Sequence, residues 1–177
     1  MKVGQIIPPI TLPAIDGSMF DSKSLTGKKY LLTFFRFATC PFCNLRMAQL
    51  VKAKLDFGDD FEIVAIFESD IAHLKEHATS HLAQFPILAD ETRQYYELFG
   101  VENSLFGMFK GMLLRLPTAI KGMCKGYIPR EISARALIMP LSLLVDEKGE
   151  IKAVYQGKDE GDHMPLVQVQ AFANNNS

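Results

Sequence analysis

The stretch Tyr30–Cys43 reads YLLTFFRFATCPFC and leads from an apolar run into a C-x-x-C motif. The run from Tyr30 to Phe37 is so rich in apolar and aromatic residues that it predicts a central strand covered on both faces, ending at Thr39–Cys40. Apolar residues at helical spacing from Cys43 to Phe57 predict the helix that follows. The two cysteines therefore stand where a strand gives way to the N-terminus of a helix.

This position favours a redox dithiol. Free backbone N–H groups and the positive end of the helix dipole stabilise a thiolate at Cys40, which makes it the nucleophile. Cys43 follows one turn later and is placed to resolve a mixed disulfide. Pro41 suits the first helical turn, where its missing N–H is not needed. We therefore expect the pKa of Cys40 to lie below the free-cysteine value of about 8.5, and that of Cys43 not to.

A metal site is the main alternative for these side chains. A C-x-x-C can be half of a zinc site, but two more ligands are needed and the remaining cysteine, Cys124, stands alone. A structural pair of cysteines is a further alternative. His73, His77 and His81 share one helix face, and a solvated row of histidines explains them without a metal. The sequence predicts no metal and no cofactor.

Composition sets the class of protein and the partners to expect. The chain has 177 residues, of which 48% are hydrophobic and 22% charged, as in an ordinary globular protein, and we expect one domain over residues 1–177. A net charge of −1 argues against nucleic acid as a partner. The first residues lack the apolar core of a signal peptide, so we expect a cytoplasmic protein. In that reducing compartment a C-x-x-C is usually catalytic or redox-sensing.

The other predicted elements alternate strands with helices. In chain order they are a hairpin with Asp16-Gly17 at its tip, a strand over Phe61–Phe67, a helix over Ile71–Leu82, a short strand and turn at Pro86–Asp90, a helix over 91–100 closed by Gly100, a strand over Leu141–Val145, its antiparallel partner over Ile151–Tyr155, and a helix from Pro165. This order predicts an α/β fold with a mixed central sheet flanked by helices.

Several short segments, in this order, carry a family resemblance. They are Val3-Gly4, Pro8–Leu12, Asp16-Gly17, Cys40–Cys43, Phe85–Asp90, Tyr96–Val101, Leu143–Asp146 and Gly149–Ile151. Together they resemble the thioredoxin-like fold of the alkyl hydroperoxide reductase and thiol-specific antioxidant superfamily. That superfamily includes peroxiredoxins and thioredoxin-like disulfide reductases. The resemblance implies an oxidoreductase with antioxidant activity and a dithiol that forms a disulfide bond.

Two departures from the peroxiredoxin pattern bear on the reaction. Peroxiredoxins resemble one another in a Thr or Ser three residues before the peroxidatic cysteine and an Arg six residues before the Asp that ends the late strand. Here Phe37 stands three before Cys40, and Pro140 stands six before Asp146. The missing hydroxyl and guanidinium would hold a peroxide and stabilise the leaving hydroxide. We therefore expect a thiol-disulfide oxidoreductase, with a thiol peroxidase that reduces hydroperoxides as the alternative.

Pro140 resembles the cis-proline of thioredoxins and disulfide reductases. Taken alone, the Met139-Pro140 pair favours a trans proline at the start of a strand, because few X-Pro bonds are cis. The resemblance favours cis, with the backbone of the preceding residue paired to a substrate disulfide. The implied substrate surface consists of Met139, Pro140, Thr39, Pro41 and Phe42.

Glu68, at the end of the second buried strand, is a candidate for moving the proton of the dithiol. The alternative is an exposed loop acid. The expected substrate is a disulfide-containing protein or a small thiol or disulfide, with an electron donor that the sequence does not name.

Residues 104–136 form an insertion relative to the family. No acidic residue occurs between Asn103 and Arg130, whereas lysines and arginines are threaded through apolar residues. We expect helices that cover the end of the sheet near Cys40 and select acidic or hydrophobic partners. The pattern favours helices that cap the protein's own core or form a homodimer seam over helices that contact a membrane. A non-catalytic module that binds a protein or membrane surface through this insertion is the alternative of another class.

Overall fold

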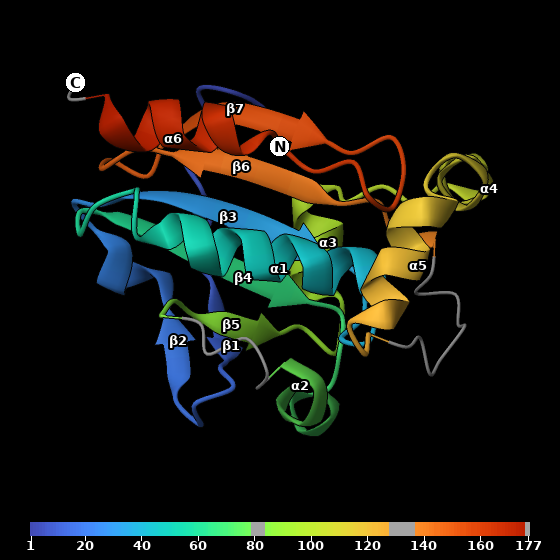
Figure 1. Cartoon of the computed structure of the whole chain (residues 1–177). Helices are drawn as coiled ribbons and strands as arrows, with labels where there is room; N and C mark the ends of the chain where they lie inside the picture. The colour runs from blue at the N-terminus through green and yellow to red at the C-terminus, as the bar shows by residue number, and fades with distance from the viewer. Residues whose placement is uncertain (79–83, 128–136, 176–177) are drawn as a thin grey trace.

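The computed structural model describes residues 1–78, 84–127 and 137–175 (Figure 1). Its centre is a mixed sheet with strand order β5-β4-β3-β6-β7. The strands are β3 (Lys29–Phe35), β4 (Phe61–Phe67), β5 (Ile87–Ala89), β6 (Leu141–Val145) and β7 (Ile151–Gln156). β3 is central: it pairs in parallel with β4 and antiparallel with β6. This mixed sheet and its flanking helices confirm the predicted thioredoxin-like fold.

Alternate residues of the central strand feed two cores on opposite faces of the sheet. Leu31 and Phe35 belong to a cluster with α1 (Pro41–Lys54), α2 (Ile71–Ala78) and α6 (Leu166–Asn174). Leu32 and Phe34 belong to a second cluster on the opposite face of the sheet. Its other members come from elements that include β1 (Thr11–Pro13), β2 (Met19–Asp21), the 3-10 helix η1 (Ser22–Leu25) and α3 (Gln94–Phe99). Burial on both faces explains why the strand is apolar throughout.

The junction between β3 and α1 differs from the prediction. The strand ends at Phe35 instead of Thr39–Cys40, and the helix begins at Pro41 instead of Cys43. Residues 36–40 form a turn in which the N–H of Cys40 donates to the carbonyl of Phe37 at 3.1 Å. β6 begins opposite Phe34, so β3 has no antiparallel partner beyond this point. The turn then leads the chain out of the sheet.

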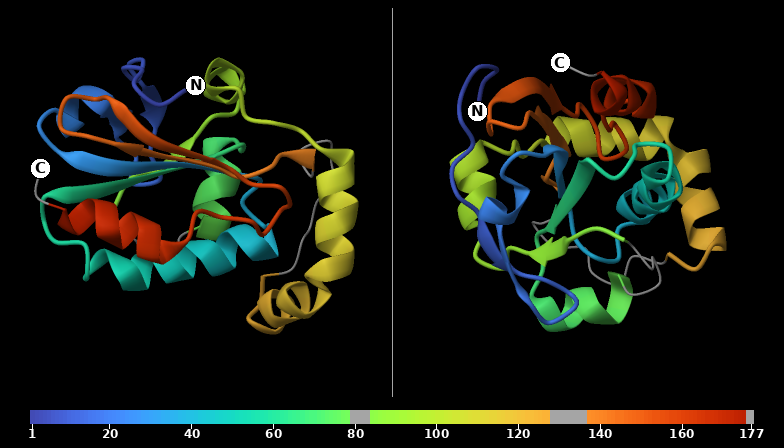
Figure 2. Two further views of the ribbon diagram at one scale, coloured as in Figure 1. Left: turned by 90° about the horizontal axis from the view of Figure 1, so that it is seen from above. Right: turned by 90° about the vertical axis from the view of Figure 1, so that its left-hand side faces the viewer.

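Two helices, α4 (Leu105–Leu114) and α5 (Leu116–Cys124), lie at the end of the sheet where β3 runs into α1 (Figures 1 and 2). Ser104 caps α4, since its hydroxyl accepts from the N–H of Gly107 at 2.9 Å. Among the described residues, none of the helices combines the length and apolar character needed to cross a membrane.

Candidate redox site

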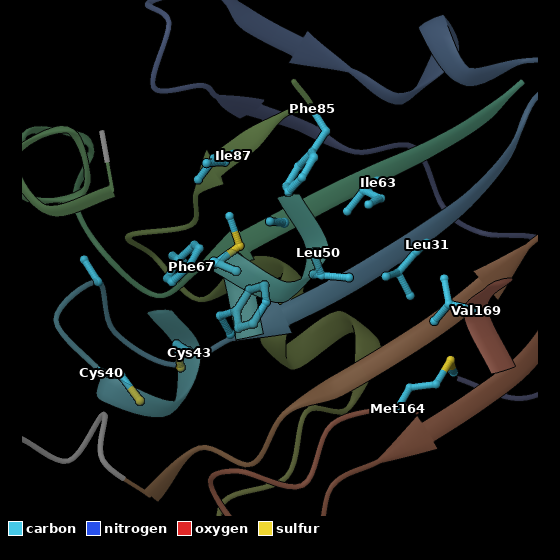
Figure 3. Close-up of a cluster of buried hydrophobic side chains, with 14 of the residues drawn as sticks. Leu31, Cys40, Cys43, Leu50, Ile63, Phe67, Phe85, Ile87, Met164 and Val169 are labelled. Carbon is cyan, nitrogen blue, oxygen red and sulfur yellow. The ribbon is translucent and has the colours of Figure 1, made fainter. Parts of the chain in front are cut away.

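Both cysteines of the C-x-x-C motif are buried at the start of α1. Cys40 is the N-cap residue with extended backbone angles, and Cys43 follows in the first turn. Figure 3 shows both at one margin of the apolar cluster beneath α1, with Leu31 and Val169 on the opposite side. A buried thiol next to free helix N–H groups is strongly affected by its few polar neighbours, because little water screens them.

Arg36 is the charged neighbour of Cys40. It leaves the end of β3 and is itself buried, with its Nη1 atom 3.6 Å from the Cys40 sulfur. The guanidinium also lies over the ring of Phe37, 5.2 Å from its centroid. The Arg36 carbonyl accepts from the N–H of Glu68 at 3.1 Å, which ties the segment to the end of β4. The fold thus holds a positive charge beside one of the two sulfurs.

The pKa values of the two thiols are shifted in opposite directions. Burial opposes ionisation of Cys40, but a hydrogen bond from the Cys43 thiol, the Arg36 guanidinium and the N–H groups of Cys43 and Phe42 outweigh it and lower the pKa of Cys40 to about 6. Burial, the hydrogen bond to Cys40 and the charge of Cys40 hold the pKa of Cys43 well above the ordinary cysteine value. At neutral pH the pair is a thiolate beside a thiol.

Asn44 fixes the turn that carries Cys40. Its buried side-chain Nδ2 donates to the carbonyls of Ala38 and Cys40, at 2.7 and 2.9 Å. Two backbone acceptors before the helix are thereby satisfied by one amide. The position of Cys40 relative to Arg36 is therefore set by the fold.

The loop over residues 157–165, between β7 and α6, covers one side of the site. Gly161 lies so close to Phe42 that a Cβ there would be 3.0 Å from a ring carbon. Asp159 accepts from Nε of Arg115, which joins α4 to α5, at 2.6 Å. Glu160 is buried against Gly111 of α4, and burial raises the pKa of its carboxyl. This loop thus connects the α4–α5 segment to the beginning of α1.

His163 lies in the same loop, with its ring 5.6 Å from the ring of Phe35. Part of the residue remains accessible, but both ring nitrogens are covered and have no hydrogen-bond partner in the described part of the chain. Burial and the charges of Arg46, Arg115 and Arg36 hold the pKa of His163 well below its usual range. His163 is therefore a neutral imidazole at pH 7.

With this geometry established, comparison with known proteins identifies the family. The AhpC/TSA family model matches residues 3–154. The chain belongs to the AhpC/TSA family. This AhpC/TSA member is 30% identical over 116 residues to peroxiredoxin Bcp of Escherichia coli K12, covering 60% of this chain and 70% of Bcp. Family and relative together make it a thioredoxin-like redox enzyme, as predicted, which sets aside the alternative of a non-catalytic module.

Solved structures share the fold of this AhpC/TSA member. Peroxidoxin BcpB from Mycobacterium tuberculosis has a TM-score of 0.71 at 16% identity, over 98% of this chain and 96% of that one. A thiol:disulfide interchange protein of the thioredoxin family from Chlorobium tepidum has a TM-score of 0.57 at 20% identity, over 98% of each chain. A peroxidoxin and a thiol:disulfide interchange protein thus share the fold, so the fold alone does not choose between their reactions.

The structure corrects the expectation of a cis-proline. The described residues contain no cis peptide bond, so Met139-Pro140 is trans. The N–H of Met139 donates to the carbonyl of Glu102 at 2.9 Å, and the Pro140 carbonyl accepts from the N–H of Gly157 at 2.7 Å. These bonds hold the approach to β6 extended. The resemblance to thioredoxins therefore does not extend to the conformation of this proline.

The predicted substrate surface is covered in this structure. Thr39, Pro41 and Phe42 flank Cys40 in the chain and are buried, as are Met139 and Pro140. The register places Pro140 next to Leu141, which pairs with Phe34 of β3. The five residues thus lie at the same end of the sheet, and their contact with substrate stays a prediction.

Glu68 is not an exposed loop acid. It is 2% exposed, and its carboxylate forms an ion pair with Nε of Arg93 at 3.4 Å. Its link to the dithiol is the backbone bond to Arg36 described above. A part in proton transfer stays a prediction.

Among the described residues, no group of three or more His, Cys, Asp or Glu side chains is placed to hold a metal ion. His73 and His77 stack edge to face on α2 with ring centroids 4.5 Å apart. His81 and the predicted end of that helix lie outside the described residues.

Sequence reasoning overlooked Arg36, Asn44 and His163. Arg36 had a signal: a single cation at the end of an apolar strand, four residues before Cys40. A buried arginine in that position needs an anionic partner nearby. His163 gave no signal of this kind, because only the fold brings residues 157–165 back to the start of α1.

Proposed function

We propose that this redox enzyme is a thiol-disulfide oxidoreductase in which Cys40 attacks and Cys43 resolves. The Cys40 thiolate attacks one sulfur of a substrate disulfide, whose S–S bond breaks, and the departing sulfur takes up a proton. Cys43 then loses its proton and attacks the Cys40 sulfur of the mixed disulfide. The second substrate thiol leaves, and the protein is oxidised by two electrons while the substrate is reduced.

The proposal rests on the opposite pKa shifts of the two thiols. A thiolate is the attacking species, and the thiol with the lower pKa is the better leaving group in the return direction. Cys40, with a pKa of about 6, fits both roles, whereas Cys43 remains protonated until its neighbour has reacted. Formation of the mixed disulfide removes the Cys40 charge that raises the pKa of Cys43, so the first step prepares the second.

A thiol peroxidase is the second candidate, and Arg36 favours it. The arginine expected six residues before Asp146 is absent, but Arg36 brings a guanidinium to 3.6 Å from the Cys40 sulfur by another route. A fixed cation at this distance can stabilise the oxygen that leaves when a peroxide bond breaks. In that reaction the thiolate takes one oxygen, the other leaves as an alcohol or water, and Cys43 converts the sulfenic acid to a disulfide with loss of water.

Access to the site also separates the two candidates. Both sulfurs are fully buried, so a protein disulfide reaches Cys40 only if the covering segments move. A small hydroperoxide needs less space. A homodimer and a cytoplasmic location remain predictions for either reaction, and the electron donor is not named by the sequence.

The test oxidises the reduced protein with each substrate class in turn. All variants carry Cys124→Ser, because Cys124 is exposed and would react separately. We expect a small disulfide to convert the dithiol to the Cys40–Cys43 disulfide, one equivalent for each protein, as followed by thiol loss and intact mass. If hydrogen peroxide at micromolar concentration oxidises the pair faster than the disulfide does, the peroxidase takes first place. The same protein with Cys43→Ser controls for reaction at a single sulfur.

A further inference from the structure

The two helices of the α4–α5 segment turn their glycines inward. A Cβ on Gly107 would lie 2.8 Å from Sδ of Met139 and 2.9 Å from the carbonyl oxygen of Lys158. A Cβ on Gly122 would lie 2.9 Å from Cβ of Pro41, and one on Gly111 would overlap the carboxylate of Glu160. The backbones of both helices thus approach the rest of the molecule without intervening side chains. Met108 also packs against the core, but most other large apolar side chains of the two helices point elsewhere.

The large apolar side chains of this segment face solvent. Their exposed fractions are 61% for Leu105, 79% for Phe106, 62% for Phe109, 81% for Leu113, 64% for Leu114, 52% for Leu116, 49% for Ile120 and 39% for Met123. On α4, Leu105, Phe106, Phe109 and Leu113 recur at helical spacing on the side opposite Gly107. The usual amphipathic arrangement is therefore reversed on α4, and exposed apolar side chains gathered on one part of a surface mark an interaction site. We call the exposed apolar residues of α4 and α5 the apolar patch.

The same segment carries only basic residues among its charged ones. Lys110 stands on α4, and Lys121 and Lys125 are exposed at the end of α5. The sequence from 104 to 130 contains no aspartate or glutamate, although the whole chain has a net charge of −1. Exposed apolar side chains and lysines thus occur together on the two helices.

The two helices run in different directions along the same flank of the molecule. Figure 1 views α4 along its axis and α5 from the side, whereas Figure 2 (left) reverses these directions. The exposed apolar side chains of both helices therefore belong to one end of the molecule.

We propose that this face, formed by α4 and α5, docks on the surface of an anionic phospholipid bilayer. Apolar side chains would enter the boundary between headgroups and acyl chains, while Lys110, Lys121 and Lys125 would remain among the phosphates. A second copy of the chain fits less well, since symmetric pairing would bring the two sets of lysines together with no acid on either face. The sequence pattern alone favoured self-packing or a homodimer seam. The outward direction of the apolar side chains argues against self-packing, and the lysines without acidic partners argue against a homodimer seam.

The test places one fluorophore on the proposed face. The chain has no tryptophan, so Leu113→Trp introduces a single reporter at a position that is 81% exposed. Leu55→Trp, at 78% exposed and at the C-terminal cap of α1, is the matched control. Full-length reduced protein is mixed with vesicles of phosphatidylcholine, with or without about 30% phosphatidylglycerol. We expect a blue shift and protection from acrylamide for Leu113→Trp with anionic vesicles, and neither for Leu55→Trp.

Sedimentation with the same vesicles tests the charge. Replacing Lys110, Lys121 and Lys125 together by glutamine is expected to weaken binding to anionic vesicles by at least about tenfold. Replacing Lys2, Lys28 and Lys148 by glutamine changes the net charge equally and should leave binding within about twofold.

Three results would overturn the proposal. They are absence of binding to anionic vesicles, an equal response of both tryptophan reporters, and a blue shift of Leu113→Trp without vesicles that grows with protein concentration, which would assign the face to a second copy. Far-ultraviolet circular dichroism of every variant establishes that it is folded. Alkylation of Cys40 at an unchanged rate establishes that the redox site is intact, so binding is read separately from the dithiol.

Discussion

The Nη1 atom of Arg36 lies 3.6 Å from the sulfur of Cys40, and both side chains are buried. The two residues are only four positions apart and stand at the two ends of one turn: Arg36 directly follows β3, and Cys40 caps α1. The intervening turn, held by Asn44, brings a permanent cation to a thiol that burial alone would keep protonated. The Arg36 guanidinium thus lowers the pKa of Cys40, second to the hydrogen bond from the Cys43 thiol.

Replacing Arg36 tests this relationship directly. An opposite charge within about 4–6 Å lowers the pKa of an acid by about 1–3 units, so Arg36→Met should raise the pKa of Cys40 by that amount. An increase of about two units would reduce the thiolate fraction at pH 7 roughly tenfold. The measurement is the rate of iodoacetamide alkylation against pH. Arg36→Lys should restore much of the shift, and Arg46→Met, which removes another buried arginine, should cause a smaller change. If the alkylation rate of Arg36→Met has its inflection at the same pH as the parent, the guanidinium does not lower the pKa of Cys40.

The stability of the reduced protein should depend on pH through Cys40. Its pKa of about 6 in the folded state lies below the unfolded value of about 8.5. The folded state therefore releases the proton first, and the free energy of unfolding should rise between about pH 6 and 8.5, by at most about 3 kcal/mol. Above that range the raised pKa of Cys43 acts in the opposite direction. Urea unfolding under reducing conditions should show the rise in the parent and a flatter profile in Cys40→Ser; equal profiles would contradict the assignment.

His163 should destabilise the fold in a lower pH range. Its folded-state pKa lies well below the unfolded value, so the stabilisation is complete above about pH 6.5 and is lost as the pH falls. His163→Phe removes two covered nitrogens and the titration, and should reduce the loss below pH 6.5 by up to about 1.4 kcal/mol for each pH unit. Stability at pH 7 should be equal or higher, because no hydrogen bond within the described chain is given up. His77→Asn on α2 is the control and should retain the acid loss, which His163→Phe should not.

The contact between α5 and α1 should control access to Cys40. Gly122→Ala adds a methyl group 2.9 Å from Cβ of Pro41, which should cost about 1–3 kcal/mol and move α5 outward. Alkylation of Cys40 by a bulky maleimide should then accelerate more than alkylation by iodoacetamide. Thr118→Ala, on an exposed position of the same helix, should leave the ratio of the two rates unchanged. If Gly122→Ala lowers stability without changing that ratio, α5 contributes to packing but does not restrict access to Cys40.

Local pattern predicted the parts of the fold that are determined locally. β4 and β6 have the bounds expected from their apolar runs, and α3 is closed by Gly100, its C-cap, in the left-handed conformation that glycine favours, although the helix begins at Gln94 instead of residue 91. The position of Cys40 at a helix N-terminus follows from the same kind of signal. These features depend on neighbours in sequence, so periodicity and turn residues reveal them.

The remaining features depend on contacts between distant segments. The early end of β3 reflects the point at which its partner β6 begins, and the trans conformation of Pro140 accompanies hydrogen bonds to Glu102 and Gly157. The outward apolar face of α4 could be predicted only if the inward direction of Gly107 and Gly111 were known. The composition of that segment is equally compatible with either orientation, so only the structure distinguishes them.

The most direct measurement traps the first intermediate. In the Cys124→Ser background, reduced protein with Cys43→Ser is mixed with a small aromatic disulfide, and intact mass is recorded over time. The account predicts one stable adduct on Cys40, at a rate that follows a pKa of about 6, and no adduct of comparable rate when Cys40→Ser replaces Cys43→Ser. A faster or equal adduct on Cys43, or an adduct on Cys40 that is released without Cys43, would contradict the assignment of attacking and resolving sulfurs.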